Sequence, residues 1–190
     1  MRDIALIGRA RSGKDTVGAR LVSRYGYTRL AFADPLKAML LDINPVVPYD
    51  LPGFGLQVIR LAALVDHIGW DRAKEEYPEA RKLLQRVGQS IRTRDPDYWV
   101  RVLVDSMDGI SGPIVVTDVR YLNEAAALER RGFRLVRITR PFGGETVDAE
   151  ELAVRRHISE VELADFPTPL TITNTGTLAD LRAQADTLPH

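Results

Sequence analysis

The 190-residue sequence predicts an α/β fold, in which an open five-stranded parallel sheet carries helices on both faces and a helical segment is inserted between two strands. Several short apolar runs show no alternation with polar residues, which is typical of strands buried on both faces of a parallel sheet. Segments with apolar residues at helical spacing separate these runs. Strand and helix therefore alternate along the chain, as in an open α/β sheet.

The first 26 residues predict a strand, a loop and a helix in that order. Residues 4–7 form an apolar run that stops at Gly8, and a glycine-containing loop follows. From Thr16 onward, apolar residues recur at helical spacing until Gly26, which is a stop signal for a helix.

A second strand and helix are predicted at residues 27–40. The strand covers 27–32, and Asp34-Pro35 supplies the N-cap residue and the first-turn proline of a helix that continues through Lys37 to Leu40. The segment 44–55 is rich in proline and glycine, so it predicts a loop and a mobile edge.

Residues 42–108 predict a helical insertion between the second and third strands of the sheet. Apolar spacing indicates helices at 56–68 and 79–91, and Asp95-Pro96 begins a third helix with Trp99 on its apolar stripe.

The rest of the chain resumes the alternation of strands and helices, and the glycine-containing stretch 141–148 is predicted to be mobile. The predicted elements are a strand at 114–118, a helix at 123–131, a strand at 134–139, a charged helix at 150–163, a strand at 170–173 and a helix at 177–188.

Composition excludes several classes of protein. Lys and Arg balance Asp and Glu at 26 each, so the chain lacks the broad positive field of a dedicated nucleic-acid binder. It has no cysteine, which excludes disulfides, thiolate zinc sites and a cysteine nucleophile. We find no signal peptide and no apolar run near the ~18 residues of a membrane span, so we expect a soluble cytoplasmic protein.

The segment from Gly8 to Thr16 carries the strongest motif. It reads G-R-A-R-S-G-K-D-T and matches the phosphate-binding loop G-x-x-x-x-G-K-[ST], except that Asp15 takes the hydroxyl position and Thr16 follows one residue later. In such loops backbone N–H groups surround a phosphate, the helix N-terminus faces the anion, and the lysine, here Lys14, reaches the outer phosphates. The strand before the loop and the helix after it are the context that this motif requires.

Asp15 places a carboxylate where the motif has a hydroxyl residue, and this difference points to a possible role in metal binding. A carboxylate beside triphosphate oxygens repels them unless a cation lies between, and magnesium prefers oxygen ligands. The alternative is that Asp15 only begins the helix, where an acidic residue suits the helix dipole.

Two further carboxylates are expected at the same edge of the sheet. Asp118 ends a predicted strand, where it lies near the metal, receives a proton, or instead pairs with Arg120 as part of the structure. In the next helix, Asn123 is predicted to cap the N-terminus, and Glu124 is an open candidate.

A phosphate loop does not by itself distinguish a motor, a GTPase, an ATPase and a small-molecule kinase. A kinase with a phosphorylated acceptor needs cations for that acceptor and mobile cations that close over the triphosphate. Candidates for the first set are Arg11, Lys37 and Arg92, and for the second Arg137, Arg140, Arg155 and Arg156. Taken singly, each of these residues is more often a solvated surface cation, but as a pattern they carry more weight.

Two segments near the C-terminus add weaker candidates. His157, in the charged stretch, either hydrogen-bonds a phosphate or carboxylate or lies on a helix surface. The turn from Asn174 through Gly176 to Thr177 lies at the expected sheet edge, so its backbone either contacts a nucleobase or only turns the chain.

Taken together, these segments resemble the bacteriophage deoxynucleoside monophosphate kinases, a family with a P-loop NTPase fold. The resemblance is carried by Gly-Lys-Asp-Thr at 13–16, Phe-Ala-Asp-Pro-Leu-Lys at 32–37, Leu-Leu-Gln-Arg-Val-Gly at 83–88 with Arg92, Asp-Pro-Asp-Tyr-Trp at 95–99, Asp-Val-Arg-Tyr-Leu-Asn-Glu at 118–124 and His-Ile-Ser-Glu at 157–160. It spans most of the chain, and residues 42–80 match least well.

The resemblance implies magnesium-dependent transfer of the γ-phosphoryl group of ATP to a deoxynucleoside 5′-monophosphate. It implies one kinase domain over 1–190, with 42–108 binding the acceptor and 140–162 forming a mobile lid. It implies no nucleic-acid or membrane partner, a monomer or homodimer, and the host cytoplasm if a phage encodes the chain.

The residue roles implied by position fall into three groups. Lys14, Arg11, Asp118 and Arg140 are the expected catalytic residues. ATP is expected at Gly8, Ala10, Ser12, Gly13, Lys14, Asp15, Thr16, Arg137, Asn174 and Gly176, with magnesium at Asp15. The acceptor is expected at Arg11, Asp34, Lys37, Arg92, Asp118, Arg120, Glu124, His157 and Glu160.

Two other functions remain open. The first is another P-loop small-molecule kinase, such as a phosphomevalonate or dephospho-coenzyme A kinase. The second is a nucleotide-binding module without kinase activity, although nothing in the sequence marks a positioned water for hydrolysis.

Overall fold

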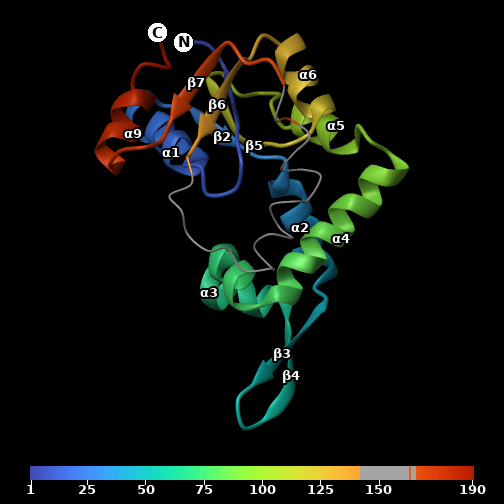
Figure 1. Cartoon of the computed structure of the whole chain (residues 1–190). Helices are drawn as coiled ribbons and strands as arrows, with labels where there is room; N and C mark the ends of the chain where they lie inside the picture. Colours follow the sequence, from blue (N-terminus) through green and yellow to red (C-terminus); the bar gives the residue numbers. More distant parts are fainter. Residues whose placement is uncertain (142–162, 164–165) are drawn as a thin grey trace. The chain divides into compact units, whose positions relative to one another are not determined.

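The computed structural model describes residues 1–141, 163 and 166–190, and it divides into two compact units (Figure 1). The first unit comprises Met1–Phe32 and Val100–His190, and the second comprises Ala33–Trp99. The glycine-containing stretch at 141–148, the charged helix at 150–163 and the lid at 140–162 lie almost entirely outside the described residues.

The first unit is built on a five-stranded parallel sheet, as predicted. Its strand order is β2-β5-β1-β6-β7, and every neighbouring pair is parallel. The strands are β1 (Ile4–Ile7), β2 (Thr28–Leu30), β5 (Ile114–Val119), β6 (Arg134–Thr139) and β7 (Leu170–Thr173). β1 lies at the centre with all four residues buried, which explains its continuous apolar run.

Helices cover both faces of this sheet (Figure 1). On one face α1 (Lys14–Tyr25) packs beside α9 (Leu178–Ala185), and Val17, Leu21 and Leu181 join the strands in one buried cluster. On the other face, α6 (Leu122–Arg130) packs against β6. The helix α5 (Tyr98–Asp105) precedes β5 in the chain. The first and last helices of the chain, α1 and α9, are thus neighbours in the fold.

A charged contact holds α1 and α9 together. The guanidinium of Arg20 donates to both carboxylate oxygens of Asp186, at 2.8 and 2.7 Å, and the Tyr25 hydroxyl donates to the Asp186 carbonyl. The hydrogen bonds from Arg20 lower the pKa of the Asp186 carboxyl below its ordinary value.

We expect this contact to stabilise the fold only while Asp186 is ionised. Because the folded-state pKa is lowered, the stabilisation is complete above the unfolded pKa of about 3.9 and is lost as pH falls through the folded value. Asp186→Asn should lower the melting temperature at neutral pH, and its difference from the parent should shrink in acid. Thermal melts over a pH series measure this. Asp108→Asn, at an exposed carboxylate that forms no ion pair with another described residue, is the control.

The second unit combines three helices with a β-hairpin. The helices are α2 (Ala33–Ile43), α3 (Leu61–Glu76) and α4 (Pro78–Arg94), and the hairpin strands are β3 (Val46–Leu51) and β4 (Gly55–Arg60). Its core includes Leu40, Val47, Leu61, Leu64 and Ala80. The unit therefore has a hydrophobic centre of its own.

The hairpin corrects two predictions. The loop and mobile edge predicted for 44–55 is largely the strand β3 and its turn, and the helix predicted for 56–68 begins only at Leu61 because 56–60 belong to β4. The turn is of type II, since the Phe54 N–H donates to the Leu51 carbonyl and Gly53 has φ 83°. Pro52-Gly53 therefore closes a hairpin rather than a long loop.

The boundaries of other elements also differ from the predictions. Asp34 lies inside the first turn of α2, which begins at Ala33, so it is not the N-cap. Asn123 likewise lies inside α6, whose N-cap is Tyr121. The second unit, Ala33–Trp99, starts nearer the N-terminus than the insertion predicted at 42–108 and also ends before residue 108. It is only partly helical, because it contains the hairpin.

Candidate active site

The loop between β1 and α1 has a backbone that depends on its two glycines. A Cβ at Gly8 would clash with the Ile138 carbonyl oxygen, and Gly13, in the left-handed region at φ 109°, faces Asn174 and Leu181 so closely that a Cβ would lie 2.9 and 2.8 Å from them. Arg11 also has a positive φ of 60°. The chain turns tightly here before α1 starts at Lys14.

Lys14 closes this loop on itself. Its side chain is only 7% exposed, and its ammonium group donates to the carbonyl oxygens of Gly8 and Arg9, both at 2.7 Å. The lysine therefore holds a positive charge beside the N-terminus of α1. Both features favour an anion at this position.

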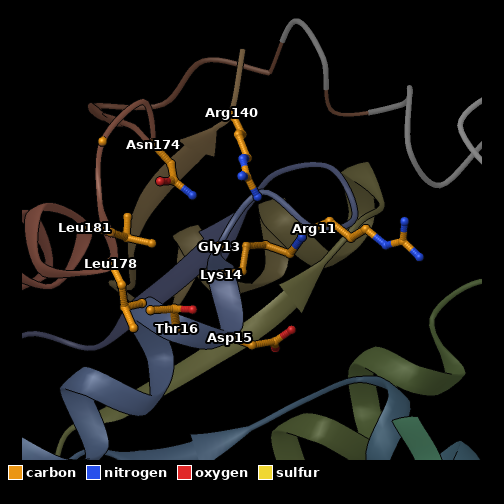
Figure 2. Close-up of a pocket in the computed structure, with 10 residues that line it drawn as sticks. Arg11, Gly13, Lys14, Asp15, Thr16, Arg140, Asn174, Leu178 and Leu181 are labelled. Carbon is orange, nitrogen blue, oxygen red and sulfur yellow. The ribbon is translucent and has the colours of Figure 1, made fainter. Parts of the chain in front are cut away.

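A pocket of about 360 Å³ opens over the loop (Figure 2). Its lining residues are Arg11, Gly13, Lys14, Asp15, Thr16, Arg140, Asn174, Gly176, Leu178 and Leu181. The Arg140 side chain reaches from the end of β6 toward the loop, so cations from two elements face this space. The pocket unites eight residues that the sequence assigned to ATP or catalysis.

The C-terminal turn is joined to the loop by a direct contact. The side-chain amide of Asn174 donates to the Ser12 carbonyl at 3.0 Å. Ser12 is buried, and its hydroxyl has no hydrogen-bond partner among the described residues. Asn174 thus holds the loop in place, a contact that the sequence did not predict; the sequence offered a backbone contact with a nucleobase or a turn alone.

Asp15 and Thr16 bring oxygen donors to the same pocket from the first turn of α1. Among the residues that the structure describes, no three His, Cys, Asp or Glu side chains cluster as a metal site. A magnesium ion fits this donor set only if a nucleotide completes it, because magnesium is commonly held by one or two carboxylates together with substrate phosphates.

The two carboxylates predicted at the same edge of the sheet as the loop, Asp118 and Glu124, make structural contacts. Asp118, in β5 next to β1, accepts a hydrogen bond from the Phe32 N–H at 2.8 Å. Glu124 is buried and accepts from the N–H groups of Arg120 and Tyr121 at the start of α6, so it takes the capping role predicted for Asn123. Neither carboxylate lines the pocket.

Arg137 also lies away from the pocket lining. Its guanidinium donates to the carbonyls of Leu163 and Phe166, at 2.9 and 2.6 Å. It anchors the segment that leads into β7, whereas Arg140 alone of the predicted closing cations lines the pocket, among the described residues.

Of the three cations predicted for the acceptor phosphate, Arg11 lines the pocket in the first unit, and Lys37 and Arg92 lie in the second unit. Lys37, on α2, pairs with Asp34 at 3.7 Å, and Arg92 is half-buried in the last turn of α4. These helices pack together, since a Cβ at Gly88 would lie 3.0 Å from the Leu36 side chain. Arg155, Arg156, His157 and Glu160 lie outside the described residues.

The sequence analysis missed Leu178 and Leu181 as pocket residues. Leu178 is 52% exposed at the first position of α9, where its apolar side chain borders a largely polar space. The available signal was the turn from Asn174 to Thr177: a helix that starts at the predicted sheet edge presents its first residues to the same site.

Comparison with known proteins yields one relative across nearly the whole chain. The chain is 26% identical over 194 residues to a protein of Acanthamoeba polyphaga mimivirus named as a proposed deoxynucleotide monophosphate kinase, covering 95% of this chain and 92% of that protein. No family model matches. The relative comes from a giant virus, so the narrower resemblance to bacteriophage enzymes stays a prediction.

Comparison with solved structures finds matches that extend over nearly the whole chain. TT1252 from Thermus thermophilus superposes with a TM-score of 0.50 at 22% identity, covering all of this chain and 98% of that one. Shikimate kinase from Aquifex aeolicus gives a TM-score of 0.48 at 13% identity over 98% of this chain and 94% of that chain. With its strand, glycine loop, lysine and helix at the centre of a parallel sheet, the chain has a P-loop NTPase fold.

No helix within the described ranges combines the length and apolar character needed to cross a bilayer.

Proposed function

We propose that the protein is a kinase that transfers the γ-phosphoryl group of ATP to a deoxynucleoside 5′-monophosphate. The observation that carries this proposal is the pocket over the phosphate loop, which is lined by Lys14, Arg11 and Arg140 at the N-terminus of α1. The mimivirus relative, which matches across nearly the whole chain, supports a deoxynucleotide as the acceptor.

ATP would bind with its phosphates at the loop. The N-terminus of α1 and the Lys14 ammonium would stabilise the β- and γ-phosphates, and Lys14 would exchange its loop carbonyl partners for phosphate oxygens. Arg140 would add charge where it develops during transfer. Leu178 and the turn at Gly176 would border the base.

The sequence assigns Arg11, Lys37 and Arg92 to the phosphate of the acceptor. Lys37 and Arg92 would contact its phosphate, and Asp34 would orient Lys37 through their ion pair. Asp118, Arg120 and Glu124 stay candidates for the acceptor, although Asp118 and Glu124 already accept backbone hydrogen bonds. His157 and Glu160 stay candidates for the lid.

Magnesium would be held by Asp15, with the Thr16 hydroxyl beside it, and when bound it would neutralise charge on the transferring phosphate. Asp15→Asn should therefore raise the magnesium concentration required for half-maximal rate. It should also weaken the magnesium dependence of ATP binding in calorimetry. If Asp15 serves only the helix dipole, both magnesium titrations will match the parent and only a small loss of stability will appear.

A panel of acceptors tests the proposed function. Purified protein, ATP and magnesium are mixed in turn with deoxynucleoside and ribonucleoside monophosphates, phosphomevalonate and dephospho-coenzyme A, and ADP release is followed. We expect release to depend on a deoxynucleoside monophosphate. Release that depends instead on one of the other two acceptors would move the protein to a different kinase class, and release without any acceptor would indicate a hydrolase.

A further inference from the structure

The β3–β4 hairpin has one face that belongs to the core of the second unit. Val47 is buried in that core and Ile59 packs against it. Tyr49, on the same face, meets the ring of Tyr77 edge-on at 5.4 Å between centroids. Because side chains alternate along a strand, the intervening residues point to the opposite side.

We call the opposite side the hairpin face, and it is formed by three cross-strand pairs. These pairs are Val46 with Arg60, Pro48 with Val58, and Asp50 with Leu56. Leu56 is 75% exposed and Val58 65%, and Phe54 at the adjoining turn is 77% exposed. Single exposed apolar residues are ordinary, but a contiguous group of this kind marks an interaction surface.

The charges on the hairpin face suit a second copy of the same face. Asp50 and Arg60 lie at opposite ends and on different strands, with apolar side chains between them. When two copies stack face to face about a two-fold axis that crosses the strands, Asp50 of each copy comes beside Arg60 of the other. Asp50 forms no ion pair with another described residue of its own chain. The face is therefore complementary to itself.

Geometry favours stacking of faces over pairing of strand edges. Pro48 lacks an N–H, so the β3 edge is a poor template for a further strand. A membrane partner fits less well, because Asp50 lies near the turn that would enter an anionic surface.

We propose that the protein forms a homodimer through the hairpin face. The resemblance implied either a monomer or a homodimer, and the hairpin face favours a homodimer with two-fold symmetry. The proposal does not depend on the catalytic assignment.

Sedimentation velocity of the full chain over a concentration series tests the dimer. We expect the parent to dimerise reversibly, and the double variant Leu56→Lys/Val58→Lys to sediment as a monomer with an unchanged circular dichroism spectrum. Leu122→Lys, at an exposed leucine of α6 in the first unit, is the matched control and should still dimerise. A parent that is monomeric at every concentration, or a dimer that survives the double variant, overturns the proposal.

Charge exchange tests the two-fold arrangement. Asp50→Arg and Arg60→Asp should each raise the dissociation constant of the dimer by about tenfold or more, because close charge pairs across interfaces are coupled by energies of this size. The variant with both changes should recover the parent's dissociation constant. Failure of the double variant to recover contradicts the arrangement. Binding of the monomeric parent to phosphatidylserine vesicles, lost on Leu56→Lys/Val58→Lys, would assign the face to a membrane instead.

Discussion

Lys14→Ala should lower kcat for phosphoryl transfer by a factor on the order of 10³ or more, as expected when a cation that stabilises the transferring phosphates is removed. The ammonium donates to the carbonyls of Gly8 and Arg9 in the loop, and Lys14 is not part of the apolar core, so the fold should persist. Steady-state kinetics, together with a thermal melt, separate loss of chemistry from loss of structure.

Lys74→Ala is the control for this prediction. Lys74 lies on α3 of the second unit and pairs with Asp71 at 2.9 Å, so its removal deletes a lysine far from the loop in sequence. Its activity should match that of the parent. Activity of Lys14→Ala within about tenfold of the parent would refute the assignment of the phosphate loop.

Arg92→Lys should impair use of the monophosphate while leaving ATP binding unchanged. A guanidinium can bind a phosphate through two parallel hydrogen bonds, which an ammonium cannot. Loss of one charge-assisted hydrogen bond predicts a rise in KM for the acceptor of about tenfold or more. Kinetics at varied acceptor give KM, and calorimetry without acceptor gives the affinity for ATP.

The neighbouring Arg94 provides the matched control. It lies in the same last turn of α4 but is exposed, so Arg94→Lys should leave both measurements unchanged. Equal losses of ATP and acceptor affinity in Arg92→Lys would place Arg92 with the donor nucleotide. No loss of either would make it a surface cation.

The sheet of the first unit was predictable because its signals are local. Each central strand is a short apolar run, and the predicted spans 4–7, 134–139 and 170–173 match the observed strands. The loop was equally accessible, since glycines at Gly8 and Gly13 are demanded by the backbone itself. Local patterns of this kind do not depend on distant parts of the chain.

The hairpin was missed because two signals competed within it. Proline at Pro48 and Pro52 favours a loop, whereas the alternation of Val47 and Tyr49 with exposed residues favours a strand. Proline is tolerated in an edge strand and in a type II turn, so both signals are satisfied at once. The apolar residues of β4 were assigned to a helix, because a short apolar run alone does not distinguish the two.

Contacts between site residues that are far apart in the sequence could not be predicted from the spacing of residues along the chain. Asn174 donates to Ser12 across 162 residues, and Glu124 is engaged by backbone N–H groups that any residue type would present. The sequence placed these residues at the correct sheet edge, but their partners depend on how the strands are ordered. Only the fold supplies that order.

The most direct test of the central claim follows the labelled γ-phosphate of ATP in the presence of a deoxynucleoside monophosphate and magnesium. If the protein is the proposed kinase, the label will appear in the deoxynucleoside diphosphate, and Lys14→Ala will abolish this product. Label that appears only in inorganic phosphate, or remains in ATP with every deoxynucleoside monophosphate, would contradict the account.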